Sequence, residues 1–239
     1  MNDEGKAQQE FIHTLEKMRL QLDEIKKSAP EIGHAQDARQ TPEIRYGRLF
    51  EIAETIAEIV ETKEPYKEFH HLRVADLACA IGTEMNLSDN RIRGLHLGGI
   101  IHDIGKMFVP SEILVKPTKL TETEAEQLQT HVRAGYDILK NFYFPWPVAR
   151  MVLEHHERIN GSGYPGGLTG DNLLMESRIL AVADVVEAIA SPRPYRPGRG
   201  IDVSLYDLKG NRNILYDPEA VDVCICLFKE KGYKLIKDE

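Results

Sequence analysis

The chain lacks any apolar run long enough to cross a membrane. Its longest apolar stretch, ILAVADVVEAIA, is interrupted by Asp184 and Glu187, whereas a membrane helix needs about 20 apolar residues in a row. The N-terminal residues MNDEGKAQQE are polar, which does not fit a secretory signal peptide. We therefore expect a cytoplasmic protein that does not bind a membrane.

Cysteine is scarce: the 239 residues include three, Cys79, Cys224 and Cys226. Their number is odd and their spacing matches no zinc site, which argues against a disulfide-stabilised secreted domain and favours a reducing compartment. The Cys224-x-Cys226 pair lies in an apolar stretch. Free cysteine behaves as a small buried hydrophobe, so this pair predicts core packing.

Positive charge is also in short supply. The chain has 30 Lys and Arg against 38 Asp and Glu, for a formal net charge of −8. This balance argues against binding to a nucleic-acid polymer, which needs a basic footprint. A small anionic ligand held by a few local cations stays compatible with it.

Alternating strand patterns are missing, and the periodicity that is present predicts an all-α fold. One core-facing helix face is marked by Ile52, Ile56, Ile59 and Val60. Ser88, the Thr121–Glu124 capping box and Asp217–Pro218 indicate helix starts. The further helices that we expect span residues 67–86, 88–102, 121–140, 145–157, 176–190 and 217–232.

The N-terminal part differs from the rest of the chain. A heptad seam is followed by Pro30 and Gly33, which break it. We expect an N-terminal helix and linker over residues 1–43, and one domain over 44–239. The seam fits either a helix that packs on its own domain or the coiled coil of a homodimer. Its residues are Phe11, Leu15, Met18, Leu22 and Ile25.

The stretch GGIIHDIGK places an imidazole and a carboxylate directly after an apolar run. Burying an ionised carboxylate is costly unless it is paired or binds a metal. Further histidines stand where expected helices begin, continue or end, and Asp184 interrupts an apolar stripe. The resulting candidate ligands are His70, His102, Asp103, His131, His155, His156 and Asp184.

Imidazole and carboxylate ligands together suit Fe, Mn, Zn or Ni better than Mg or Ca. Seven ligands are too many for one tetrahedral zinc. They fit two metal ions that share a bridging carboxylate and a bridging water. Such a site acidifies the water and stabilises both the attacking and the leaving oxygens of a phosphoryl displacement.

The motifs HDIGK, HHERINGSGYP, RILAVAD and RPYRP, in this order, resemble the HD-GYP family. The resemblance runs from about Tyr46 to Tyr233. It implies an all-α bundle with a five-helix HD core and added helices. It also implies a phosphodiesterase that acts on cyclic dinucleotides, chiefly cyclic di-GMP.

The resemblance also implies roles for single residues. The seven candidates match the metal ligands of the family, with Asp103 as the bridge between two metals. Lys106 matches the lysine that contacts the scissile phosphate. Arg193 and Arg196 match basic residues that hold ligand phosphates, and Tyr164 belongs to the GYP loop beside the substrate pocket.

Two positions depart from the family pattern. Tyr66 stands where some members have a glutamate that binds a third metal, which favours two metals here. Asn160 replaces an aspartate that often precedes the GYP motif, so a carboxylate near the site loses its charge. No matched ligand is missing, which favours an active enzyme.

The leading interpretation is a metal-dependent hydrolysis of cyclic di-GMP to pGpG, GMP or both, by a hydroxide that bridges two ions. Fe or Mn is expected, with Ni or Zn as alternatives. A second interpretation keeps the site but changes the substrate to cyclic GMP–AMP or another nucleotide. A third is a signalling module that binds cyclic di-GMP without turnover.

Overall fold

The expected all-α class is confirmed in the computed structural model, which describes residue 13 and residues 42–64, 69–192 and 198–235. The α-helices in this part of the chain are α2 (Pro42–Glu61), α3 (His70–Glu84), α4 (Asp89–Ile101), α5 (Ser111–Leu114), α6 (Glu122–Leu139), α7 (Val148–Glu154), α8 (Met175–Ala190), α9 (Ile201–Gly210) and α10 (Pro218–Lys229). Two short 3-10 helices are η2 (Ile104–Phe108) and η3 (Gly170–Asn172). The N-terminal seam lies outside the described residues, and the 1–43 boundary and the two alternatives for the seam stay predictions.

Local sequence signals set several helix starts. The Thr121 side chain accepts a hydrogen bond from the Glu124 amide, and the Glu124 carboxylate accepts one from the Thr121 amide. Asp217 caps α10 by accepting from two amides, as expected. Ser88 is the N-cap of α4, but its side chain makes no capping hydrogen bond.

Three α-helices depart from the expectations: α5 and α9 were not expected, and α7 is shorter than the helix predicted there. The helix expected over 145–157 is shorter, because Pro147 is the N-cap of α7 and the chain turns at His155 and His156. Helix α9 follows the Pro-rich stretch SPRPYRPG, in a part of the chain for which no helix was predicted. Gly200, with φ of 80°, precedes it and allows the change of direction.

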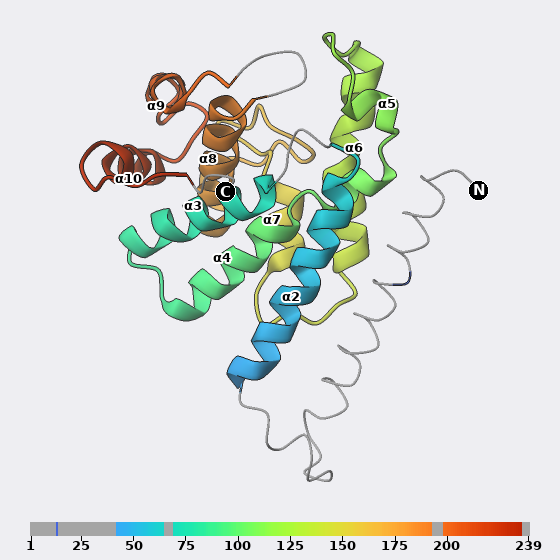
Figure 1. The fold of residues 1–239 in the computed structure, drawn as a ribbon. Coiled ribbons are helices and arrows are strands. Elements are labelled where there is room, and N and C mark those ends of the chain that lie inside the picture. The colour runs from blue at the N-terminus through green and yellow to red at the C-terminus, as the bar shows by residue number, and fades with distance from the viewer. Residues whose placement is uncertain (1–12, 14–41, 65–68, 193–197, 236–239) are drawn as a thin grey trace, which may run out of the picture.

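Figure 1 shows how the helices are arranged, and two hydrophobic cores hold them together. Helices α2, α4, α6 and α7 surround the first, and α3, α8, α9 and α10 surround the second. Helix α4 contributes Leu95 to the second core and Leu97, Ile100 and Ile101 to the first, so it connects the two. Representative buried residues are Ile56, Leu97, Leu139 and Met151 in the first core, and Leu77, Leu95, Leu180 and Cys224 in the second.

Glycines explain how the chain around HDIGK packs closely against α3 and α6. A Cβ atom on Gly105 would lie 1.9 Å from the carbonyl oxygen of His131, so η2 approaches α6 at a distance that only glycine permits. A Cβ on Gly99 would lie 2.7 Å from the Cα of Ala75, where α4 crosses α3. The two contacts bring α4 close to α3 and η2 close to α6.

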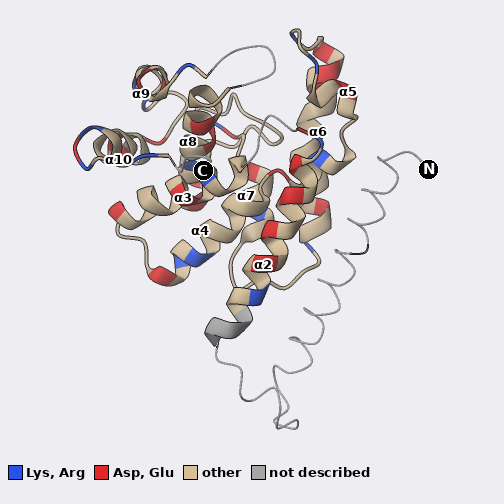
Figure 2. Cartoon of the chain, viewed as in Figure 1, with Lys and Arg blue, Asp and Glu red and all other residues tan. Residues whose placement is uncertain are grey.

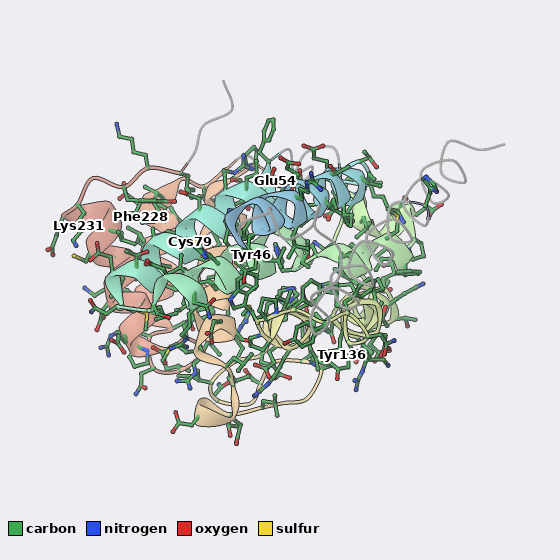
Figure 3. The ribbon with its side chains drawn as sticks, turned by 90° about the horizontal axis from the view of Figure 1, so that it is seen from below. Tyr46, Glu54, Cys79, Tyr136, Phe228 and Lys231 are labelled. Atoms are coloured by element: carbon green, nitrogen blue, oxygen red, sulfur yellow. The ribbon has the colours of Figure 1, made fainter. Side chains whose placement is uncertain are left out.

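The surface carries acidic residues along α2 and α6, with basic residues interspersed (Figure 2). Seen from below, Phe228 and Lys231 lie at the edge of the molecule near Cys79 of α3 (Figure 3). Lys231 forms an ion pair with Glu84 there.

Cys224 is buried as expected, whereas Cys226 is half-buried. None of the described helices is both long enough and apolar enough to span a membrane.

Candidate metal centre

The structure brings the seven predicted ligands together in two groups. Within each group, one possible ligand atom per residue lies within 4.8 Å of those of the other members. We call them the α6–α7 group (Asp103, His131, His155 and His156) and the α3–α8 group (His70, His102 and Asp184).

Asp103 lies between the two groups. Its Oδ1 atom is 3.5 Å from His131 Nε2. Its Oδ2 atom is 3.6 Å from His102 Nε2 and 3.8 Å from His70 Nε2. Asp184, by contrast, faces one group: its Oδ1 atom is 3.6 Å from His70 Nε2 and 3.9 Å from His102 Nε2. The two oxygens of Asp103 therefore suit a bridge between two ions.

Most of the buried imidazoles are oriented by their own helices. Three rings place Nδ1 against the backbone carbonyl three residues earlier, at 2.7–2.8 Å; these pairs are His102 with Gly99, His131 with Leu128, and His155 with Val152. A proton on Nδ1 leaves Nε2 with a lone pair.

The Nε2 atoms of His70, His102, His131 and His155 are buried and make no hydrogen bond within the described part of the chain. Buried polar atoms without partners are rare. Four such lone pairs around Asp103 fit metal ions, which would satisfy all of them.

Burial also sets the protonation state that a metal needs. Desolvation lowers the pKa of His131 to about 4 and holds the pKa of His155 well below its usual range. Burial raises the pKa of Asp184, but the nearby imidazoles of His102 and His70 more than offset this, so the net shift is downward. Neutral imidazoles beside ionised carboxylates are the ligand forms that divalent transition metals bind.

Lys106 lies beside Asp103. The helix expected over 88–102 corresponds to α4, which ends at Ile101, and Lys106 lies in the 3-10 helix η2 that follows. A 3-10 helix has three residues per turn, so Asp103 and Lys106 still share one side. Lys106 Nζ is 2.5 Å from Asp103 Oδ2 and 3.1 Å from Glu64 Oε2.

The GYP loop is held against the metal ligands. The Tyr164 ring lies 4.9 Å from the His156 ring, centroid to centroid. The buried carboxylate of Glu157 accepts hydrogen bonds from the amides of Gly166 (2.6 Å) and Leu168 (3.1 Å). Burial raises the pKa of Tyr164, so its phenol is neutral at physiological pH. Asn160 is exposed and forms a turn with Ser162.

Three predicted residues, Arg193, Arg196 and Tyr66, lie outside the described residues. Two carboxylates that the sequence reasoning did not assign lie at the site: Glu157 and Glu187. Glu187 stands three residues after Asp184 in the same apolar stripe, so the signal that singled out Asp184 could have found it.

A model of the HD domain matches residues 54–220, well over half of the chain. The chain belongs to the HD domain family. Its motifs and relatives place it in the HD-GYP group of this family. HD domains of this kind depend on metal ions, and the two groups around Asp103 could hold them.

Two curated relatives illustrate the likeness. The cyclic di-GMP phosphodiesterase response regulator RpfG of Xanthomonas campestris pv. campestris is 39% identical over 64% of this chain and 41% of its own length. The 3'3'-cGAMP-specific phosphodiesterase 3 of Vibrio cholerae is 36% identical over 79% of this chain and 40% of its own length. This HD-GYP chain thus spans about 40% of the length of these relatives.

Solved structures share the fold. A HDG"Y"P protein from Bdellovibrio bacteriovorus superimposes with a TM-score of 0.59 at 16% sequence identity, over 77% of this chain and 63% of the other. The likeness supports the expected HD-domain bundle with added helices.

Proposed function

We propose that this HD-GYP chain is a phosphodiesterase that hydrolyses cyclic di-GMP to pGpG, GMP or both. One observation carries the proposal: four buried imidazole Nε2 atoms without partners surround Asp103, which faces both ligand groups. Two divalent ions, Fe or Mn, with Ni or Zn as alternatives, would fit this ligand set. When bound, they would acidify the attacking water and neutralise charge on the phosphate.

The side chains around the two groups suit the remaining tasks. Lys106 Nζ stands beside the Asp103 carboxylate, where an ammonium can stabilise charge that develops on a phosphate oxygen. Arg193 and Arg196, which lie outside the described residues, match the basic residues that hold ligand phosphates in the family, and guanidinium groups suit that task. Tyr164 offers an aromatic ring for a guanine base, and its contact with His156 ties that ring to the α6–α7 group.

A second candidate substrate is cyclic GMP–AMP. Relatives of Vibrio cholerae carry the name 3'3'-cGAMP-specific phosphodiesterase and are 36% and 38% identical to this chain where they align. The two substrates share their phosphodiester linkages and differ in one base. The residues that contact the bases, and not the metal ligands, therefore decide which of the two cyclic dinucleotides is preferred.

The test uses the purified chain loaded anaerobically with Fe(II) or Mn(II). Each cyclic dinucleotide is added separately, and the products are resolved by chromatography. We expect linear dinucleotide or mononucleotide to form, and we expect the His102→Ala variant to form none. Binding of cyclic di-GMP without any hydrolysis would contradict the proposal and support a signalling module.

A further inference from the structure

His70 differs from the other buried imidazoles in how its ring is held. His102, His131 and His155 each use the carbonyl of the preceding helical turn. His70 is the first residue of α3, so no helical turn precedes it. Its Nδ1 atom instead lies 2.5 Å from the Oε2 atom of Glu187 on α8.

Three residues hold the carboxylate of Glu187 in place: His70, Arg73 and Ser191. Its side chain is 1% exposed. Its Oε1 atom accepts hydrogen bonds from Arg73 Nε at 2.9 Å and Ser191 Oγ at 2.7 Å, and lies 2.8 Å from Arg73 Nη2. Arg73 and Ser191 thus contact Oε1, and Oε2 faces the His70 ring.

We propose that Glu187 is the positioning residue of the α3–α8 group. It holds the proton of His70 on Nδ1 and so aims the lone pair of Nε2 at a metal. A carboxylate partner also makes an imidazole a stronger donor than a carbonyl partner does. The inference rests on the metal centre of the proposed function and adds an asymmetry to it: one ion depends on Glu187 and the other does not.

The competing explanation is purely structural. The Arg73–Glu187 pair joins α3 to α8, and breaking it would loosen both helices without any specific effect on a metal. Glu154 offers a matched control, because it is also a buried glutamate of the site helices. It accepts from the Leu174 amide and pairs with Arg150, and none of its hydrogen bonds reaches a predicted ligand.

The first experiment compares Glu187→Gln with Glu154→Gln in the full chain. Metal is removed with a chelator, and Mn(II) is titrated in competition with a chromogenic chelator. For Glu187→Gln we expect one of the two affinities to fall about ten- to a hundredfold, while the other stays close to wild type. Glu154→Gln should leave both affinities unchanged, and Glu187→Asp should restore part of the loss.

Two unchanged affinities in Glu187→Gln, or equal losses at both sites, would overturn the inference. A second measurement needs no variant. Side-chain nitrogen NMR of the Zn(II)-loaded wild type should show a proton on His70 Nδ1 and a metal-shifted Nε2. A proton on Nε2, or metal bound through Nδ1, would overturn it even if Glu187→Gln failed to fold.

The metal titration also separates this inference from the proposed function. Suppose that Glu187→Gln weakens one of two metal affinities but the wild-type protein leaves cyclic dinucleotides intact. That result would contradict the proposed function alone. A wild type that hydrolyses cyclic di-GMP, with a Glu187→Gln variant of normal metal affinity, would defeat the role of Glu187 alone.

Discussion

The two ligand groups are built in different ways. In the α6–α7 group, His131 and His155 are oriented by carbonyls of their own helices, so local helix formation sets their direction. In the α3–α8 group, His70 depends on Glu187, which reaches it from another helix. In the α6–α7 group, the two rings with known partners are thus both oriented by secondary structure, whereas the α3–α8 group combines one such ring, His102, with one held by tertiary packing, His70.

This difference has an energetic consequence. A ring oriented by the preceding turn keeps its direction whenever that helix is intact. A ring oriented across an interface loses its direction when α3 and α8 shift relative to each other. We therefore expect the α3–α8 group to be the more sensitive of the two to changes in packing, with Asp103 as the one residue on which both depend.

The largest expected effect comes from Asp103→Asn. Asp103 faces both groups, so losing its charge should remove both ions and abolish hydrolysis. Asp184→Asn, the matched variant, faces only the α3–α8 group and should lose one ion. Metal content per chain, measured by elemental analysis, checks both. Two ions retained in Asp103→Asn would contradict the bridge.

The next effect concerns Lys106, which contacts Asp103 but is not a predicted ligand. Lys106→Ala should keep both ions and lower kcat about a hundredfold, the usual scale for loss of one donor to the transition state. Lys116→Ala is the control, because Lys116 pairs with Glu124 in a partly exposed position. Loss of metal in Lys106→Ala would instead make this lysine a structural partner of Asp103 and Glu64.

Features that depend on local sequence could be predicted from the chain, whereas features that depend on packing between helices could not. Capping chemistry is local, so Thr121, Glu124 and Asp217 allowed two helix starts to be predicted. The seven candidate ligands stood out as five histidines and two carboxylates, and the fold brings all seven together. Whether each one binds metal stays a prediction.

The remaining features depend on distances between helices, which one sequence does not encode locally. At the switch from α4 to η2, Gly105 approaches His131 of α6 too closely for a larger residue, and this approach depends on how the helices pack. The hydrogen bonds of Glu157 to the GYP loop span nine and eleven residues. Helix α9 was missed because its neighbours in sequence are prolines and glycines, whereas its burial comes from α8 and α10.

A smaller effect is expected at the GYP loop. Glu157→Gln keeps the shape of the side chain but weakens its hydrogen bonds to the Gly166 and Leu168 amides. Tyr164 should then be less well positioned, so we expect KM to rise about tenfold, the loss of roughly 1.4 kcal/mol of binding. Metal content should stay unchanged. Asn160→Ala, on the exposed turn of the same loop, is the control, and an equal rise in KM there would contradict a specific role for Glu157.

The smallest expected effect is the response of the metal-free chain to acid. Burial lowers the pKa of His131 to about 4, whereas an unfolded histidine titrates near about 6.5. Between these values the unfolded state binds more protons, so stability is fully present above pH 6.5 and is lost as pH falls toward 4. We expect Tm to drop by about 5 °C between pH 7 and pH 5, measured by circular dichroism after chelation. His131→Gln removes this titrating group from the α6–α7 group and should drop less. A Tm that rises on acidification would mean that the folded chain takes up more protons than the unfolded one, which would contradict buried neutral imidazoles in this group.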